Sequence, residues 1–251
     1  MEKRVIVIPE GTEVLESTWK KQEETVKRII VPKSVTKILN DTFIHLKGAI
    51  ITLPYALWAT LTVDCVSDGT HPPHHCESSV VFKVIMDDGM YIYSYMATRA
   101  DEEINTQKGL LYNQCLRTNN FSSSDKWIEE AEYGTLKLPN KVMPYLCRLA
   151  TPHKLSKENE KRFVEFIEKN VARCIKQIAL FDCPDMLRVL FQNGFVTPAR
   201  KKQILEALQG ANAEECLSEF EAISSEAVEA VPVKKTTSKS TAATDSKKKQ
   251  K

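Results

Sequence analysis

Glycine and histidine are both scarce in this chain, which limits the kinds of active site that it can build. The 251 residues include 8 glycines and 5 histidines, and His153 is the single histidine after residue 75. The sequence contains no Gly-rich phosphate loop, no nucleophile elbow and no pair of histidines at helical spacing. These absences predict that the protein is not an enzyme, and no residue is assigned a catalytic role.

Long hydrophobic runs are lacking as well. No apolar stretch reaches the roughly 18 residues that a membrane-spanning helix needs. The apolar run at 5–8 is too short for a signal peptide and is followed at once by Pro9. We therefore expect a cytoplasmic protein that does not contact membranes.

Cysteine is present in an odd number and without a paired spacing. Seven scattered cysteines fit reduced thiols better than a disulfide framework. Five of them stand among apolar residues and are predicted to act as small core hydrophobes: Cys115, Cys147, Cys174, Cys183 and Cys216.

The charge is unevenly distributed, although the formal net charge is only +2. The segment from Pro232 to Lys251 holds seven lysines and one aspartate, so the preceding residues carry a net charge of −4. Its Lys, Ser and Thr composition predicts a disordered tail. Lys247, Lys248 and Lys249 are candidates for contacting nucleic acid or an acidic surface, and a purely solubilising tail is the alternative.

One short phrase is written three times in the first sixty residues. Apolar runs end at Pro9, Pro32 and Pro54, and the prolines lie 23 and 22 residues apart. A fixed period of this length is typical of a solenoid, in which each repeat stacks on the next. So short a stack exposes apolar faces at both ends unless another element covers them.

The second repeat resembles a known family. The phrase at 30–38, Ile-Val-Pro-Lys-Ser-Val-Thr-Lys-Ile, followed by Phe43, is similar to the leucine-rich repeats of the BspA type. Thr18-Trp19 and Thr42-Phe43 occupy the place of the family's Ala-Phe pair, while Leu39 stands where the family has glycine. The resemblance implies degenerate repeats with an apolar strand, a proline and a turn in each.

Residues 59–79 are predicted to form a loop that holds the one cluster of metal-type ligands. It contains His75 and four candidate zinc ligands: Cys65, His71, His74 and Cys76. Sulfur and imidazole ligands could assemble a tetrahedral zinc site, and zinc is the one cofactor considered. Adjacent ligands at 74–76 converge on one ion with difficulty, so the spacing favours a solvated loop.

Residues 80–96 predict a β-hairpin with its turn at Asp87-Asp88-Gly89. Tyr91, Tyr93 and Tyr95 recur at period two on its second strand. Two interpretations are open. The rings could form a platform on which bases stack, or they could be the half-buried face of a sheet, which is the commoner arrangement.

From residue 100 onward the apolar period changes to 3.6, which predicts helices. Expected elements include a helix at 101–118, one at 142–150 that ends at Thr151-Pro152, one capped by Ser156 and one capped by Thr197 before Pro198. The segment 185–194 resembles the second helix and closing glycine of an ankyrin unit, and 213–220 occupies the same place about 28 residues later.

The predicted fold class is α+β. Residues 1–98 are expected to form degenerate BspA-type leucine-rich repeats, similar to a short β-solenoid, plus the hairpin. Residues 99–223 are expected to form a helical domain with ankyrin-like α-hairpins, and 224–251 the disordered tail. Together with Arg148-Leu149-Ala150, Pro152 and the segment 155–158, this order resembles a class of bacterial leucine-rich-repeat proteins of unknown function.

The predicted function is a non-enzymatic protein–protein interaction or scaffold module, because repeat proteins present extended surfaces that recognise partners without chemistry. Its protein partner is not identified. Two alternatives are kept. One is a nucleic-acid-binding protein that uses the basic tail and the tyrosine strand. The other is a zinc-binding protein that uses the Cys/His loop.

Overall fold

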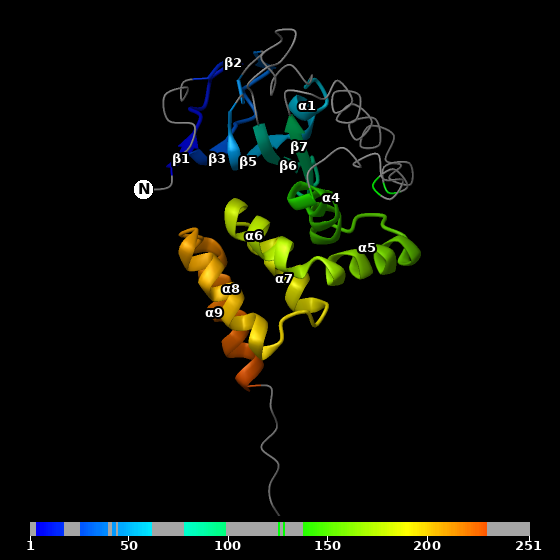
Figure 1. Ribbon diagram of the computed structural model, residues 1–251. Helices are drawn as coiled ribbons and strands as arrows, with labels where there is room; N and C mark the ends of the chain where they lie inside the picture. The colour runs from blue at the N-terminus through cyan, green and yellow to red at the C-terminus, as the bar shows by residue number, and fades with distance from the viewer. Residues whose placement is uncertain are drawn as a thin grey trace, which may run out of the picture.

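The chain is built mostly of strands up to residue 98 and of helices from residue 138 onward (Figure 1). The structure, a computed structural model, describes residues 4–17, 26–39, 42–43, 45–61, 78–98, 125, 128 and 138–229. Within these residues the protein has a mixed α/β fold with a sheet dominated by parallel pairs. The predicted combination of an N-terminal β part and a C-terminal helical part is confirmed at this level.

The main sheet has five strands in the order β1-β3-β5-β6-β7. Four of them are parallel: β1 (Arg4–Val7), β3 (Val26–Ile30), β5 (Lys47–Pro54) and β6 (Ser78–Ile85). The last strand, β7 (Tyr91–Thr98), is antiparallel to β6, which confirms the predicted hairpin. A second, two-stranded parallel sheet consists of β2 (Val14–Leu15) and β4 (Lys37–Ile38).

The strand register repeats the spacing of the prolines. Ile6 lies opposite Ile29, and Ile29 lies opposite Ile51, so neighbours across the sheet are 23 and 22 residues apart. In the small sheet Leu15 lies opposite Ile38, again 23 residues apart. Because equivalent residues stack side by side, Ile6, Ile29 and Ile51 form a row across the main sheet.

The main sheet separates two apolar cores, because side chains along a strand alternate between its faces. One core lies between the main sheet and the small sheet with α1 (Tyr55–Trp58), and it contains the ring contact of Trp58 with Phe82, whose centroids are 4.8 Å apart. The other core lies between the opposite face and the helices. Ile50 and Val81 of the sheet belong to this second core.

The helices lie on the side of this second face (Figure 1). They are α4 (Leu138–Ala150), α5 (Lys157–Lys169), α6 (Val171–Phe181), α7 (Pro184–Gln192), α8 (Pro198–Gly210) and α9 (Glu214–Glu229). Helices α4 and α6 are next to the sheet, and α8 and α9 are farther from it. The predicted caps are confirmed, since Ser156 Oγ accepts from the Asn159 amide at 3.1 Å and Thr197 Oγ1 accepts from the Arg200 amide at 3.3 Å. Helix α4 contacts β7, and α6 contacts β5.

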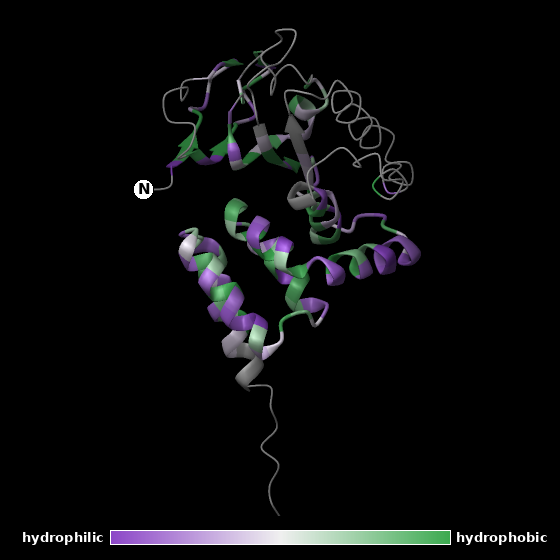
Figure 2. Ribbon diagram, viewed as in Figure 1, coloured by the Kyte–Doolittle hydropathy of each residue, from purple (hydrophilic) through white to green (hydrophobic). Residues whose placement is uncertain are grey.

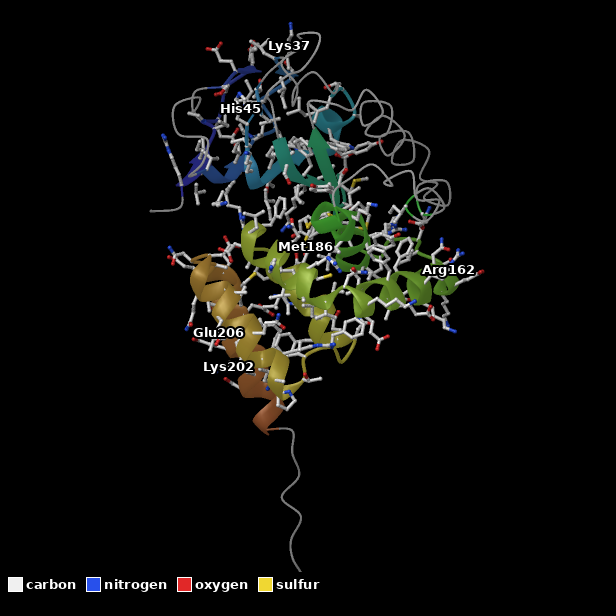
Figure 3. The ribbon with its side chains drawn as sticks, in the orientation of Figure 1. Lys37, His45, Arg162, Met186, Lys202 and Glu206 are labelled. Atoms are coloured by element: carbon white, nitrogen blue, oxygen red, sulfur yellow. The ribbon has the colours of Figure 1, made fainter. Side chains whose placement is uncertain are left out.

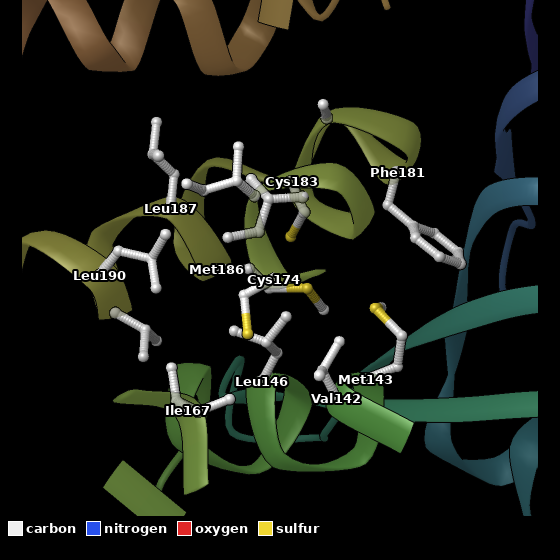
Figure 4. Packing of buried hydrophobic residues seen from close by; sticks show 14 of the residues in the cluster. Val142, Met143, Leu146, Ile167, Cys174, Phe181, Cys183, Met186, Leu187 and Leu190 are labelled. Carbon is white, nitrogen blue, oxygen red and sulfur yellow. The ribbon is translucent and has the colours of Figure 1, made fainter. Parts of the chain in front are cut away.

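The second core is a dense cluster of aliphatic, aromatic and sulfur side chains (Figure 4). Met186 lies near its centre, whereas Lys202 and Glu206 lie on the exposed side of α8 (Figure 3). Four thiols, Cys147, Cys174, Cys183 and Cys216, are buried and free, as predicted. Burial raises the pKa of the Cys174 thiol to about 12, so this thiol stays protonated and unreactive at neutral pH.

Two helix boundaries differ from the predictions, and one predicted helix cannot be compared. Helix α4 was expected to begin at residue 142 but begins at Leu138, and Pro139 lies in its first turn, where proline lacks no needed hydrogen bond. Helix α9 was expected to end at Ile223 and continues through Glu229. The helix predicted at 101–118, with Cys115, lies outside the described residues.

Candidate functional site

The tyrosines of β7 face the helices. The hydroxyl groups of Tyr91 and Tyr93 donate to one carboxylate oxygen of Asp185, the second residue of α7, at 2.9 and 2.6 Å. Tyr95 packs edge-on against Phe181, with ring centroids 6.2 Å apart. Tyr93 is only 3% exposed. The arrangement matches the half-buried face of a sheet, and the buried Tyr93 ring offers no surface on which a base could stack.

Charged side chains surround this group of tyrosines. Arg188 pairs with Asp185 and makes two hydrogen bonds to Glu219 at 2.6 and 2.8 Å. The Lys83 ammonium lies 3.9 Å from the centroid of the Tyr91 ring, a cation–π contact. Each of these charges therefore has an opposite charge or an aromatic ring beside it. The contacts hold α7 against the sheet and α9 against α7.

The phenol groups of these tyrosines are held in the neutral form. Burial, assisted by the hydrogen bond to Asp185, raises the pKa of Tyr91 to about 12. Burial raises the pKa of Tyr93 and Tyr95 as well. A phenol of such high pKa does not act as a base or nucleophile near neutral pH, so the cluster has the chemistry of a structural contact.

We predict that the free energy of unfolding falls as the pH rises from 10 to 12. Since Tyr91 titrates near 10 when unfolded and near 12 when folded, the unfolded chain releases its proton first. The stabilisation is complete below pH 10 and declines between 10 and 12. Urea midpoints measured from pH 8 to 11.5 should fall less steeply for the Tyr91→Phe/Tyr93→Phe variant. Equal slopes for both proteins would contradict the assignment.

The other residues predicted to form sites lie outside the described residues. These are the candidate zinc ligands Cys65, His71, His74 and Cys76, and the tail lysines Lys247, Lys248 and Lys249. Within the described ranges, no group of three or more His, Cys, Asp or Glu side chains is placed to hold a metal ion. No helix in those ranges is long and apolar enough to cross a membrane.

Arg28 of β3 connects the sheet to two helices, a role that no local sequence pattern predicts. Its guanidinium donates to the carbonyl of Phe181 at 2.8 Å, to the carbonyl of Asp182, and to the Glu215 carboxylate at 2.9 Å. The carboxylate of Asp182 accepts from the Cys216 amide at 2.9 Å and so caps the start of α9. Asp182 itself ends α6, in a left-handed conformation.

Beyond Arg28, the same face of the sheet carries an exposed apolar surface. Val5 and Val7 of β1 are 55% and 64% exposed, and Ile30 of β3 is 42% exposed. Val7 lies opposite Ile30, and Val5 lies opposite Arg28, so these side chains project from one face. We call Val5, Val7 and Ile30 the edge surface. Figure 2 shows the hydrophobic residues along these strands.

The edge surface is exposed because the contacts of α6 and α9 with the sheet reach β5 and Arg28 of β3 and leave Val5, Val7 and Ile30 exposed. Leu180, near the end of α6, approaches β5 so closely that a Cβ placed on Gly48 would lie 2.7 Å from its Cγ. No strand among the described residues lies on the outer side of β1. The opposite edge differs, because the Thr151 hydroxyl accepts from the Tyr93 amide of β7 at 3.1 Å.

Sequence reasoning located this surface only in part. The repeat pattern predicts apolar faces at both ends of a short stack. At one end β6 pairs with β5, and at the other end β1 is the last strand among the described residues. The run Val5-Ile6-Val7-Ile8 predicted an apolar strand that ends at Pro9, without indicating which of its side chains are exposed. Only the length and position of α6, which depend on contacts distant in sequence, determine that two of these residues stay exposed.

Comparison of the chain with protein-family models, with curated proteins and with solved structures finds no match.

Proposed function

We propose that the protein is a non-enzymatic interaction module that binds a protein chain on its edge surface. The observation that carries the proposal is the exposure of Val5 and Val7, at 55% and 64%, on an edge strand. Edge strands of folded proteins usually carry a charge, a proline or a covering segment that prevents pairing. In β1 the residues between Arg4 and Pro9 are all β-branched and apolar.

The chemistry of the surface favours a protein partner. An edge strand offers backbone donors and acceptors to another extended chain, and the apolar side chains beside it add contact area. Phosphate recognition would require basic side chains directed at the ligand. Arg28, the basic residue next to the edge surface on this face, already donates to three backbone carbonyls and to Glu215.

We also propose that β1 to β5 form a short stack of leucine-rich repeats of the BspA type. The support is the register, since equivalent apolar residues lie opposite one another at intervals of 22 and 23 residues. Gly11 donates its amide to Ser34 Oγ at 3.0 Å, so the turns of successive repeats are also joined. The helices from α6 onward would then be the ankyrin-like part.

Site-specific photo-cross-linking tests the proposal. A benzophenone amino acid placed at Val7 of the full chain, in the cells that naturally produce it, should cross-link to one defined protein. The same probe at Ala172, an exposed position of α6, should not give that product. Ile30→Lys should abolish the Val7 product, because a charge in the middle of an apolar contact is costly to desolvate. Identical products from both positions, or none from Val7, would refute the proposal.

The two alternative functions receive no support from the described residues. Binding of nucleic acid relied on the tyrosines of β7, which the helices α6 and α7 cover, and on the tail lysines, which lie outside the described ranges. Zinc binding relied on the Cys/His loop, which lies outside the described ranges. We therefore base the proposal on the edge surface alone.

A further inference from the structure

We infer that the chain bound at the edge surface is a second copy of this protein, whose β1 pairs antiparallel with β1 around a two-fold axis at Ile6. The inference rests on the proposed function and specifies its partner. A two-fold contact requires a surface that is complementary to itself. Three features of β1 meet this requirement: its backbone, its side chains and its charges.

The backbone of β1 leaves the required groups on its outer side. The Ile8 amide donates to the Ile30 carbonyl at 2.9 Å, which places the amides and carbonyls of Ile6 and Ile8 on the side of β3. The amides and carbonyls of Val5 and Val7 therefore point away from the sheet. In an antiparallel pair centred on Ile6, Val5 lies opposite Val7 of the second copy and exchanges both hydrogen bonds with it.

Side-chain packing is continuous across the same axis on both faces of the sheet. On the helical face, the edge surfaces of the two copies join into one apolar row, and Ile30 flanks the valines on each side. On the other face, Ile6 packs against the first apolar core. Ile6 of the two copies would lie directly opposite each other, where non-hydrogen-bonded side chains approach most closely.

The charges at the two ends of the strand are complementary. Pairing around Ile6 places Arg4 opposite Ile8 of the second copy. Glu10 follows Ile8 by two residues, and Arg4 and Glu10 are both exposed. Glu10 lies in the turn that follows β1, close to the end of the paired segment, so we expect its long side chain to reach Arg4 of the second copy, giving two Arg4–Glu10 pairs in each dimer. A parallel arrangement would instead place like residues side by side.

The contact is small, so the dimer is expected to be reversible. Only about five residues of each β1 segment would pair. The area that they bury would be well below the roughly 800 Å² per partner of a stable complex. Sedimentation velocity of the purified full chain should show a weight-average mass that rises toward twice 28.5 kDa as the concentration increases from about 5 to 500 µM.

Two kinds of variant test the geometry. Val7→Pro removes an amide that points outward and leaves the hydrogen bonds to β3, so it should weaken the dimer roughly tenfold or more without unfolding the chain. Arg4→Glu and Glu10→Arg should each weaken the dimer as well. The double variant Arg4→Glu/Glu10→Arg should restore it, because both copies carry the exchange.

The outcomes separate this inference from the proposed function. A concentration-independent monomer, or a double variant that fails to restore the dimer, overturns self-pairing. If the benzophenone at Val7 then still cross-links to a different protein, the interaction module stands with another partner. If it cross-links to nothing, both proposals fail.

Discussion

Replacing Arg148 by methionine is expected to lower the free energy of unfolding by about 3–5 kcal/mol, the usual effect of removing one member of a buried ion pair. Both side chains of the Arg148–Asp125 pair are only 2% exposed. The guanidinium donates to the two carboxylate oxygens of Asp125 at 2.7 and 3.2 Å and to the carbonyl of Thr151 at 3.1 Å. The variant would leave a carboxylate in an apolar environment without its partner.

A double variant distinguishes loss of the pair from loss of packing. Replacing both charges, as in Arg148→Met/Asp125→Leu, should recover most of the stability, since an apolar pair of similar volume often replaces a buried ion pair at little cost. Urea denaturation followed by circular dichroism measures all three variants, including Asp125→Leu alone. If Arg148→Met lowers the free energy of unfolding by less than about 1 kcal/mol, the pair contributes no more than an exposed ion pair does.

Replacing Gly48 by alanine is expected to destabilise the fold by about 2–4 kcal/mol, from positive-φ strain together with overpacking. Gly48 has φ +73° and lies in β5 between Lys47 and Ala49, where the pairing of β5 with β6 shifts register. A Cβ there would lie 2.7 Å from Leu180 Cγ and 3.0 Å from the Leu180 carbonyl oxygen. The end of α6 would have to move away from the sheet.

Gly11 provides the matched control for this substitution. It has φ +86°, and a Cβ placed on it would meet no atom within 4 Å. Gly11→Ala should therefore show only the conformational strain, about 1 kcal/mol. Thermal or urea unfolding of both variants compares the two losses directly. Equal losses at the two positions would show that close packing against Leu180 adds nothing.

The sequence predicted best what depends on local spacing. The prolines at 9, 32 and 54 anticipated the register of the parallel strands, and Asp87-Asp88-Gly89 anticipated the turn of the hairpin. Ser156 and Thr197 identified two helix starts, because a side-chain cap acts within three residues. Whether the strands and helices belong to the BspA-type and ankyrin-like families remains a prediction.

Contacts between segments that are distant in the chain could not be predicted from local sequence patterns. Asp185 appeared as a residue of a helix start, yet its carboxylate receives the hydroxyl groups of two tyrosines more than 90 positions earlier. Asp182 lies just before α7 along the chain, yet its carboxylate caps α9. Nothing in the composition around either aspartate indicates which distant strand or helix it will meet.

The contacts of Arg28 have a consequence for the order in which the protein folds. They join residues that are 153, 154 and 187 positions apart, so each closes a very long loop. During synthesis the strands leave the ribosome well before α6 and α9. One face of the sheet therefore stays without its packing partners until these helices have been made. We expect the helical half to fold through its own short-range contacts and to dock last, with Arg28 completing the final step.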